Sequence, residues 1–146
     1  MNSPKKNGIV LLEAGPCQFC GAQTKRGIHE CLEIFNLGFP AIDYSQPENH
    51  IYRFLAVNAH TLQHSEIHGR WSNHFHLSRL HLVLRYYAKW QYQLSPQLSD
   101  HLRSYKKDNP NELLTPPAIK LRGNITTTDV LQKSTDEESC KAMVKE

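Results

Sequence analysis

The chain has 146 residues, of which 39% are hydrophobic and 21% charged, and its formal net charge at pH 7 is +3. This length and apolar content favour one compact domain over residues 1–146, with loosely ordered ends at 1–14 and 132–146. The small positive charge does not by itself indicate a nucleic-acid-binding protein, and no stretch is long and apolar enough to predict a membrane span.

The N-terminal segment and the cysteine content predict a cytoplasmic protein. The polar start leads only to the short apolar run Ile9–Leu12, whereas a secretory signal has an apolar region of about 7–15 residues. We therefore expect no secretory signal. In a reducing cytoplasm the cysteines are expected to be metal ligands, redox groups or free thiols rather than structural disulfides; they are Cys17, Cys20, Cys31 and Cys140.

The first motif along the chain is a C-x-x-C in Gly15-Pro-Cys17-Gln-Phe-Cys20-Gly-Ala. Glycine directly after the second cysteine lets the backbone turn tightly and direct amide N–H groups toward the sulfurs. This form is typical of a metal-binding knuckle. Two other interpretations stay open, namely unused thiols and a redox pair, although a thioredoxin-like pair needs a βαβ context that this sequence does not predict.

A short helix is predicted over Ile28–Leu37, followed by the helix stop signals Gly38 and Pro40. Cys31 lies on the apolar side of this helix. A buried cysteine commonly acts as a small hydrophobic residue, so this role is the alternative to metal ligation.

Two long helices are predicted next, from Pro47 to His64 and from Asn73 to Leu94. Ser45 and Glu48 have the spacing of a capping box before the first of them. The short link between the helices favours antiparallel packing. The predicted core side of the first helix carries Ile51, Phe54, Leu55, Asn58, Ala59 and Leu62.

Seven of the nine histidines fall between His50 and His81. His60 and His64 are one helical turn apart, a spacing at which two imidazoles can converge on one metal ion or one substrate atom. His74 and His81 are expected to be solvated. In the alternative interpretation His60, His68 and His74 are surface residues, and His64 only caps the end of its helix.

The part after Pro96 carries weaker signals. A short helix is predicted over Leu98–Lys106, a break at Pro116-Pro117, an extended segment over Ile119–Thr128, and a last helix after Ser134. The predicted fold class is therefore mainly α, a small helical domain with two long antiparallel helices and an N-terminal C-x-x-C metal knuckle.

We predict one divalent metal ion, Zn²⁺, held by Cys17, Cys20 and His64, with either Cys31 or His76 as the fourth ligand. Two thiolates at C-x-x-C spacing take two corners of a tetrahedron, and sulfur with imidazole selects zinc over magnesium or calcium. Gln63 or Asn58 is expected to orient one of the ligands.

Four ordered landmarks along the chain are Cys17-x-x-Cys20-Gly-Ala, Cys31 near Phe35, Val57-Asn-Ala-His-Thr-Leu-Gln-His64, and His76-Leu77. Together they resemble a family of small uncharacterised bacterial proteins, a domain of unknown function, whose core is similar to V-D-A-Y-x-x-Q-H-P followed by a helix that begins with H-L. The resemblance covers roughly Cys17 to Val130. It implies a mostly helical fold and assigns no biochemical role.

The chain departs from that pattern at three positions, with Asn58 in place of Asp, His60 in place of Tyr and Ser65 in place of Pro. An amide cannot accept a proton at neutral pH, so a general base at position 58 is lost. The resemblance also implies a tryptophan-rich last helix, which would begin where this chain reaches Lys145-Glu146. We expect either a shortened protein or a lost helix that leaves an apolar groove open.

The sequence favours a non-catalytic binding or interaction module with a structural zinc site. It contains no G-x-S-x-G, H-E-x-x-H or Gly-rich phosphate loop. Its central helices are locally cationic, which permits an anionic ligand; in the alternative interpretation these side chains only solvate the outer helix faces. The partner is left open between an anionic ligand and a protein, and no membrane is expected. One alternative is a metal-dependent hydrolase-like enzyme. Another is a single-stranded nucleic-acid-binding module that uses charge and stacking through Arg79, Arg85, Lys89, Tyr86, Tyr87, Trp90 and Tyr92.

Overall fold

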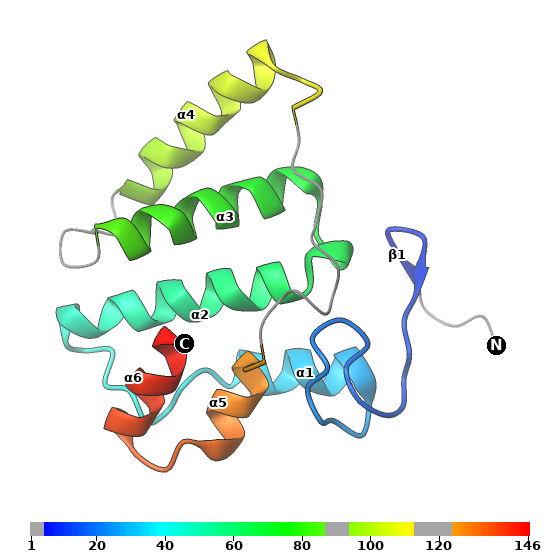
Figure 1. The fold of residues 1–146 in the computed structure, drawn as a ribbon, viewed down its shortest axis with the longest axis vertical. Helices are drawn as coiled ribbons and strands as arrows, with labels where there is room; N and C mark the ends of the chain where they lie inside the picture. The colour runs from blue at the N-terminus through cyan, green and yellow to red at the C-terminus, as the bar shows by residue number, and fades with distance from the viewer. Residues whose placement is uncertain (1–4, 87–93, 113–123) are drawn as a thin grey trace.

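The structure is a computed structural model that describes residues 5–86, 94–112 and 124–146. Within these ranges the chain is mainly helical, with the Cys17, Cys20 and Cys31 group near the N-terminus, which confirms the predicted mainly α class (Figure 1). Three predicted features lie outside the described residues: the last part of the helix that was expected to reach Leu94, the break at Pro116-Pro117, and the start of the extended segment at Ile119.

The chain starts with a two-stranded hairpin in which β1 (Lys5–Lys6) pairs antiparallel with β2 (Ile9–Val10). Asn7 and Gly8 have φ of 51° and 79°, the left-handed conformation that an Asn-Gly hairpin turn requires. The Asn7 side chain donates a hydrogen bond of 3.1 Å to the Glu66 carbonyl. The start of the apolar run Ile9–Leu12 is thus a hairpin strand, and the hairpin is tied to a distant turn.

Helix α1 (Gly27–Asn36) and helix α2 (His50–Gln63) lie close to the predicted ranges. A 3₁₀ turn, η1 (Pro47–Asn49), precedes α2, and Pro47 occupies its first position. The predicted Ser45–Glu48 capping box is wrong, because no side chain caps this turn. The Ser45 amide instead donates to Asp43 Oδ1 at 2.9 Å. This hydrogen bond of the short Asp43 side chain holds the turn through which the chain enters the helix.

Helix α3 (Arg70–Arg85) lies alongside α2 after the chain turns back through the 3₁₀ turn η2 (Ser65–Ile67) (Figure 1). The Asn73 side chain donates to the Ser65 carbonyl at 2.7 Å, so the first turn of α3 is tied to η2. Helix α3 ends at Arg85, before the predicted end at Leu94.

The remaining helices are α4 (Leu94–Asp108), α5 (Thr127–Lys133) and α6 (Glu137–Lys145). In Figure 1, α4 lies on the outer side of α3, whereas α1, α5 and α6 lie on the other side of α2. Thr126 and Asp136 form complete capping boxes at the starts of α5 and α6. Helix α2 is therefore the central element of the described fold.

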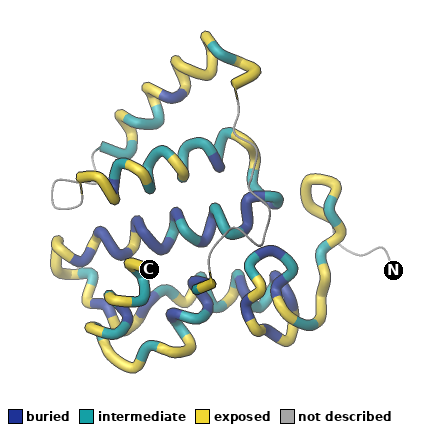
Figure 2. Tube along the Cα trace, viewed as in Figure 1, coloured by how far each residue is buried: buried dark blue, intermediate teal, exposed yellow. Residues whose placement is uncertain are grey.

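Two separate groups of buried apolar side chains hold these helices together, and Figure 2 shows the dense burial along α2. The larger group joins α2 to α3, α5 and α6 through Phe39, Ile42, Ile51, Tyr52, Phe54, Leu55, Ala56, Val83, Val130 and Cys140. The smaller group lies by the knuckle and consists of Cys17, Phe19, Ala22, Ile28, Cys31 and Ile67. It has few large apolar side chains, each worth about 1.5–3 kcal/mol when buried, so it supplies modest hydrophobic stabilisation.

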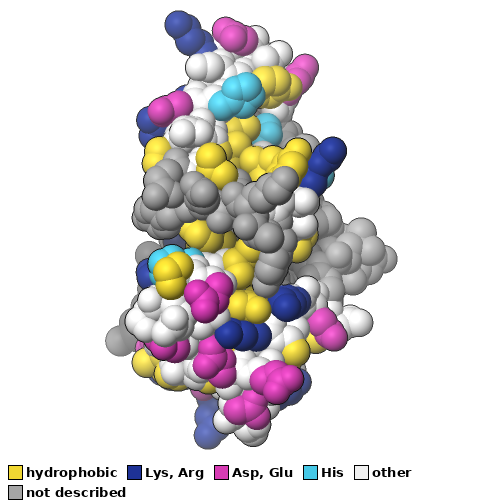
Figure 3. Space-filling view, turned by 90° about the vertical axis from the view of Figure 1, so that its left-hand side faces the viewer, with side chains coloured by type: hydrophobic (Ala, Val, Ile, Leu, Met, Phe, Trp, Pro, Cys, Tyr) yellow, Lys and Arg dark blue, Asp and Glu magenta, His cyan; other side chains and the backbone are white. Residues whose placement is uncertain are grey.

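The described surface is mixed in charge. Figure 3 shows acidic and basic side chains interspersed on the lower half of one face. Three ion pairs among the described residues follow helical spacing: Asp100–Arg103 at 3.7 Å on α4, Asp129–Lys133 at 2.8 Å on α5 and Glu137–Lys141 at 2.7 Å on α6. None of the described helices combines the length and apolar character that crossing a bilayer requires.

Candidate metal centre

The knuckle around Cys17 and Cys20 is a tight backbone turn. The Cys17 amide donates to the Ala22 carbonyl and the Gly21 amide donates to the Cys17 carbonyl, both at 2.9 Å. Gly21 has φ of 77°, a conformation that favours glycine, as expected for the residue after the second cysteine. The turn directs the side chains of Cys17 and Cys20 toward the same point.

Gly27 lets the loop that carries the knuckle pack closely against the start of α1. Its amide donates to the Gly15 carbonyl at 2.9 Å, and its φ is 55°. A Cβ atom at this position would stand 2.1 Å from the Leu12 carbonyl oxygen, so only glycine fits. The Thr24 hydroxyl bridges the carbonyls of Gly15 and Gly27, at 3.0 Å to each.

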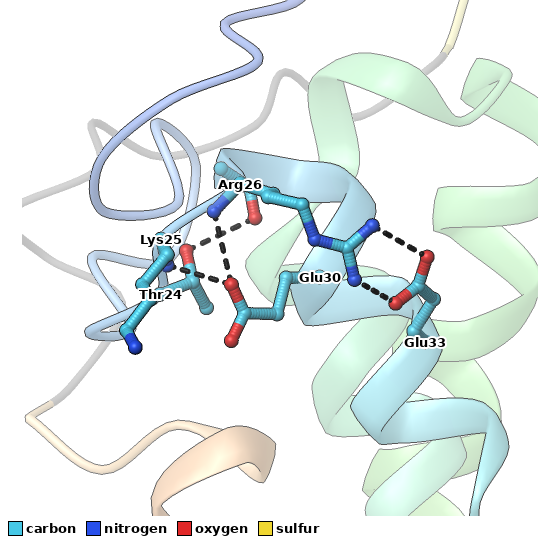
Figure 4. A network of polar contacts seen from close by, with 6 residues as sticks. Thr24, Lys25, Arg26, Glu30 and Glu33 are labelled. Carbon is cyan, nitrogen blue, oxygen red and sulfur yellow. Dashed lines mark hydrogen bonds and ion pairs between the residues drawn. The ribbon is translucent and has the colours of Figure 1, made fainter.

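Acidic side chains fix the first turn of α1, as Figure 4 shows. Glu30 Oε2 accepts the backbone amides of Lys25 at 2.6 Å and Arg26 at 2.9 Å, which satisfies donors that the helix itself leaves unpaired. These hydrogen bonds lower the pKa of Glu30. Arg26 also forms an ion pair with Glu33 through both of its terminal nitrogens. The turn that leads to Cys31 is thereby held in place.

His64 ends α2 as its C-cap residue and is fully buried. Its Nδ1 lies 2.6 Å from the His60 carbonyl oxygen, and a carbonyl can only accept, so Nδ1 carries the proton. The Nε2 lone pair therefore faces the two sulfurs of Cys17 and Cys31, each at 3.4 Å. A backbone carbonyl that holds one ring nitrogen while the other faces a metal position is a common arrangement for histidine ligands.

The four donor atoms of Cys17, Cys20, Cys31 and His64 all lie within 4.8 Å of one another. A tetrahedron with Zn–S bonds of about 2.3 Å and Zn–N bonds of about 2.0–2.1 Å has S···S edges of about 3.8 Å and S···N edges of about 3.6 Å. The sulfurs of Cys20 and Cys31 are 3.7 Å apart, and the sulfurs of Cys17 and Cys31 each lie 3.4 Å from His64 Nε2. These three separations are close to tetrahedral edges, and the four donors lie close enough together to bind one metal ion. All four cysteines of the chain are free thiols.

The electrostatics of the group favour a cation at its centre. Hydrogen bonds from the thiols of Cys20 and Cys31 lower the pKa of Cys17 despite its burial. Burial also lowers the pKa of His64, but its contacts with the Cys17 and Cys31 sulfurs and with the His60 carbonyl outweigh this effect and raise it to about 9. The sulfurs that favour a proton on Nε2 favour a divalent cation in the same place.

The Cys31 sulfur has a further polar neighbour outside the knuckle. Thr128 Oγ1 lies 3.3 Å from it, at the start of α5. A hydroxyl at this distance donates a hydrogen bond to a thiolate and stabilises its negative charge. The sequence interpretation missed this residue, and the run of three threonines at 126–128 was the only signal for it.

His60 is buried beside the group, so the alternative in which it is a surface residue is wrong. Its ring stacks on Phe35 with centroids 3.9 Å apart and lies 4.1 Å from the ring of His64. Its Nδ1 is 2.8 Å from Thr127 Oγ1. Burial lowers its pKa to about 3, so His60 is neutral at physiological pH and acts as a packed aromatic side chain.

The structure brings Cys31 to the other three donors but does not bring His76 to them. His76 instead lies at the α2–α3 contact, where its Nδ1 is 2.9 Å from Asn58 Oδ1. Arg79 donates to the same oxygen at 2.8 Å. Asn58 therefore supports His76 and Arg79 rather than a metal ligand.

The Gln63 side chain hydrogen-bonds the backbone at the start of α5 and does not orient His64, the histidine that follows it. Its amide nitrogen donates to the Ile125 carbonyl at 2.8 Å, and its oxygen accepts from the Thr127 amide at 3.4 Å. Because His64 is the next residue, these two hydrogen bonds still connect the start of α5 to the end of α2, close to the four donors.

The histidines at positions 68, 74 and 81 lie outside the four-donor group. His81 is exposed, as expected for a solvated residue, whereas His68 and His74 are half-buried. Most of the residues that were considered for nucleic-acid binding, Tyr87, Lys89, Trp90 and Tyr92, lie outside the described part of the chain.

Comparison with known proteins gives one match. A model of a family of unknown function (DUF5946) matches residues 15–146, a stretch that contains all four donor residues. No curated protein and no solved structure matches the chain.

Proposed function

The chain belongs to this family of unknown function, and we propose that it is a binding or interaction module whose N-terminal knuckle is held on the helices by a structural Zn²⁺ ion. The proposed ligands are Cys17, Cys20, Cys31 and His64. The observation that carries the proposal is the convergence of these four donors at separations close to the edges of a zinc tetrahedron.

The choice of zinc rests on the chemistry of the donors. Three sulfurs and one imidazole nitrogen form a soft ligand set, which suits zinc and does not suit the oxygen-seeking ions magnesium and calcium. Tetrahedral coordination matches the preference of zinc in structural sites. Thiolate ligands also need a reducing environment, which supports the proposed cytoplasmic location.

A structural role follows from the closure of the site. The protein supplies four donors, and Cys17, Cys31 and His64 are each at most 2% exposed. A hydrolytic zinc centre keeps one position open for water and uses a nearby general base. Four protein donors fill a tetrahedron, so the arrangement supports a structural centre over the hydrolase alternative.

The ion would join three parts of the chain. Cys17 and Cys20 come from the knuckle, Cys31 from α1 and His64 from the end of α2. The apolar group at the knuckle is small, so the metal would supply much of the stabilisation that holds this end together. Metal binding that is coupled to folding in this way contributes to the unfolding free energy.

Helix α3 exposes apolar side chains that could form a surface for a partner. Leu77 and Leu84 are two turns apart on this helix and are 41% and 57% exposed, and Tyr86 follows at its end. The Arg85 guanidinium lies over the Tyr86 ring at 5.6 Å. Apolar area beside a cation suits a protein partner or an anionic ligand.

The test is removal of the metal from protein that was purified without a polyhistidine tag. We expect stoichiometric zinc, and a melting temperature that falls by about 10 °C or more after chelation, since each 1 kcal/mol lost is worth about 2–8 °C in domains of this size range. Cys17→Ser should reproduce the loss. His81→Ala, on an exposed residue of α3, is the matched control and should retain both zinc and stability. An unchanged melting temperature after chelation would contradict a structural role.

A further inference from the structure

The four donors of the proposed zinc centre differ in their access to solvent. Cys17 is 2% exposed, and Cys31 and His64 are 0% exposed. Cys20 is only half-buried, which makes it the most accessible donor of the group. A small polar oxidant from solution would therefore reach the sulfur of Cys20 before it reached the others.

The buried thiol of Cys31 lies within reach of Cys20. Their sulfurs are 3.7 Å apart, and a disulfide bond of about 2.0 Å requires an approach of less than about 2 Å. Cys20 directly precedes Gly21 in a turn outside the helices, whereas Cys31 lies within α1. The movement can therefore take place in the turn without unwinding the helix.

Cys17 and Cys31 both face the imidazole, since each sulfur lies 3.4 Å from His64 Nε2. The group thus has one half-buried donor, Cys20, beside two buried cysteines. A Cys20–Cys31 bond would join the knuckle to α1, whereas a Cys17–Cys20 bond would stay within the knuckle.

Resting on the zinc centre proposed above, we propose that Cys20 and Cys31 are a reversible oxidative modification site at which hydrogen peroxide forms a disulfide and releases the zinc ion. The Cys20 thiolate attacks peroxide and becomes a sulfenic acid, and hydroxide leaves. The Cys31 thiolate then attacks the Cys20 sulfur, the S–S bond forms, and a second hydroxide leaves. With two protons, one peroxide and two thiolates give one disulfide and two water molecules, and Zn²⁺ departs with its charge unchanged.

Loss of these two thiolates leaves Cys17 and His64, which are too few donors to hold zinc against water. The change also reaches α5, because the Thr128 hydroxyl loses its charged acceptor at Cys31. Oxidation would therefore loosen the contact between the knuckle end and α5. A reductant together with zinc would restore both.

Cys140 provides an internal reference thiol. It is 1% exposed and packs in the other apolar group, on α6. Cys140 is shielded from solvent and lies outside the four-donor group, so an oxidant in solution has little access to it. We expect it to stay reduced when the zinc centre is oxidised.

The experiment treats the zinc-loaded full chain with one to a few equivalents of hydrogen peroxide. Zinc release is followed with a chromogenic chelator, and the thiols are mapped by alkylation and mass spectrometry. Trypsin cleaves after Lys25 and Arg26, so Cys31 falls on a different peptide from Cys17 and Cys20. A Cys20–Cys31 bond therefore links two peptides, and fragmentation between Cys17 and Cys20 identifies the linked cysteine.

We expect zinc to be released as the protein loses the mass of two thiol hydrogen atoms. The mapping should show a disulfide between Cys20 and Cys31 and a free Cys140 thiol. A phosphine reductant together with zinc should restore the zinc-bound protein. Cys140→Ser should behave as the unmodified chain does. Three results would overturn the proposed modification site. They are zinc that stays bound under peroxide, a Cys17–Cys20 disulfide, and sulfinic acid at Cys20 without a disulfide. Protein that never binds zinc would refute the zinc centre instead, and this outcome is visible before any oxidant is added.

Discussion

The hydroxyl oxygen of Thr128, at the start of α5, lies 3.3 Å from the sulfur of Cys31 on α1. These residues are far apart in the sequence and belong to helices that meet below α2 (Figure 1). The contact gives the proposed metal centre a polar neighbour from a part of the chain that supplies none of its ligands.

Thr128→Val should weaken zinc binding while the fold is kept. The substitution removes the hydroxyl at nearly constant volume, and loss of such a partner typically lowers metal affinity by about 10–100-fold. Competition with a chromophoric chelator measures the affinity, and circular dichroism checks the helices. Thr135→Val is the matched control, because Thr135 is exposed and lies just before α6. Equal zinc affinities for the two variants would show that the Thr128 hydroxyl does not act on Cys31.

Asn58→Asp should stabilise the protein. Asn58 is fully buried, its Oδ1 accepts from Arg79 and lies 2.9 Å from His76 Nδ1, and its Nδ2 has no partner among the described residues. A carboxylate needs no donor there and adds a charge-assisted bond to Arg79, so we expect the unfolding free energy to rise by about 1 kcal/mol.

Asn58→Ala tests the same site in the opposite direction. It leaves the Arg79 donor without this acceptor and removes the contact with His76, and we expect a loss of about 1–3 kcal/mol. Urea unfolding at pH 7 measures both variants. A less stable Asn58→Asp would mean that the cost of burying the carboxylate exceeds the gain from Arg79.

His76→Gln should retain zinc and change the response of stability to acid. Burial lowers the pKa of His76 to about 4, whereas an unfolded histidine titrates near 6.5. As pH falls from about 6.5 toward 4 the unfolded state binds a proton that the native state does not, so the unfolding free energy falls by up to about 1.4 kcal/mol per pH unit. The variant lacks this contribution and should show a shallower decline.

Loss of zinc in acid affects both proteins. The difference between their pH dependences therefore reports the contribution of His76 to stability. Unfolding curves at pH 7 and pH 5, together with zinc content at pH 7, provide the two readouts. A His76→Gln protein that loses its zinc would show that His76 is a ligand after all.

The sequence could predict much of the fold because local pattern determines it. The helix at α1 and the helix at α2 were placed closely, since apolar residues recur at helical spacing in both. The predicted capping box at the entry to α2 is wrong, because Asp43 and Ser45 form a local turn that competes with it.

The candidate site was only partly predictable. C-x-x-C spacing pairs Cys17 with Cys20 along the chain, but the choice between Cys31 and His76 depends on how α1 packs against α2. Burial of His60 likewise follows from its stacking on Phe35, a contact between two helices that no local pattern encodes. Tertiary packing therefore decides which of the predicted donors meet.

Gly27→Ala should destabilise the knuckle end. A Cβ at position 27 would stand 2.1 Å from the Leu12 carbonyl oxygen, and the left-handed backbone there disfavours alanine. We expect a loss of at least about 1 kcal/mol in thermal unfolding, together with weaker zinc binding. Gly69→Ala is the control, because its Cβ meets no atom within 4 Å, and its effect should stay within about 0.5 kcal/mol. Similar stabilities for the two variants would mean that the loop does not need its close approach to α1.

X-ray absorption at the zinc edge, on protein with measured metal content, tests the central claim most directly. One zinc ion per chain with three sulfur neighbours at about 2.3 Å and one nitrogen at about 2.0 Å is the expected result. Folded protein without metal, or a zinc shell with two nitrogens or with oxygen ligands, would contradict a centre formed by Cys17, Cys20, Cys31 and His64.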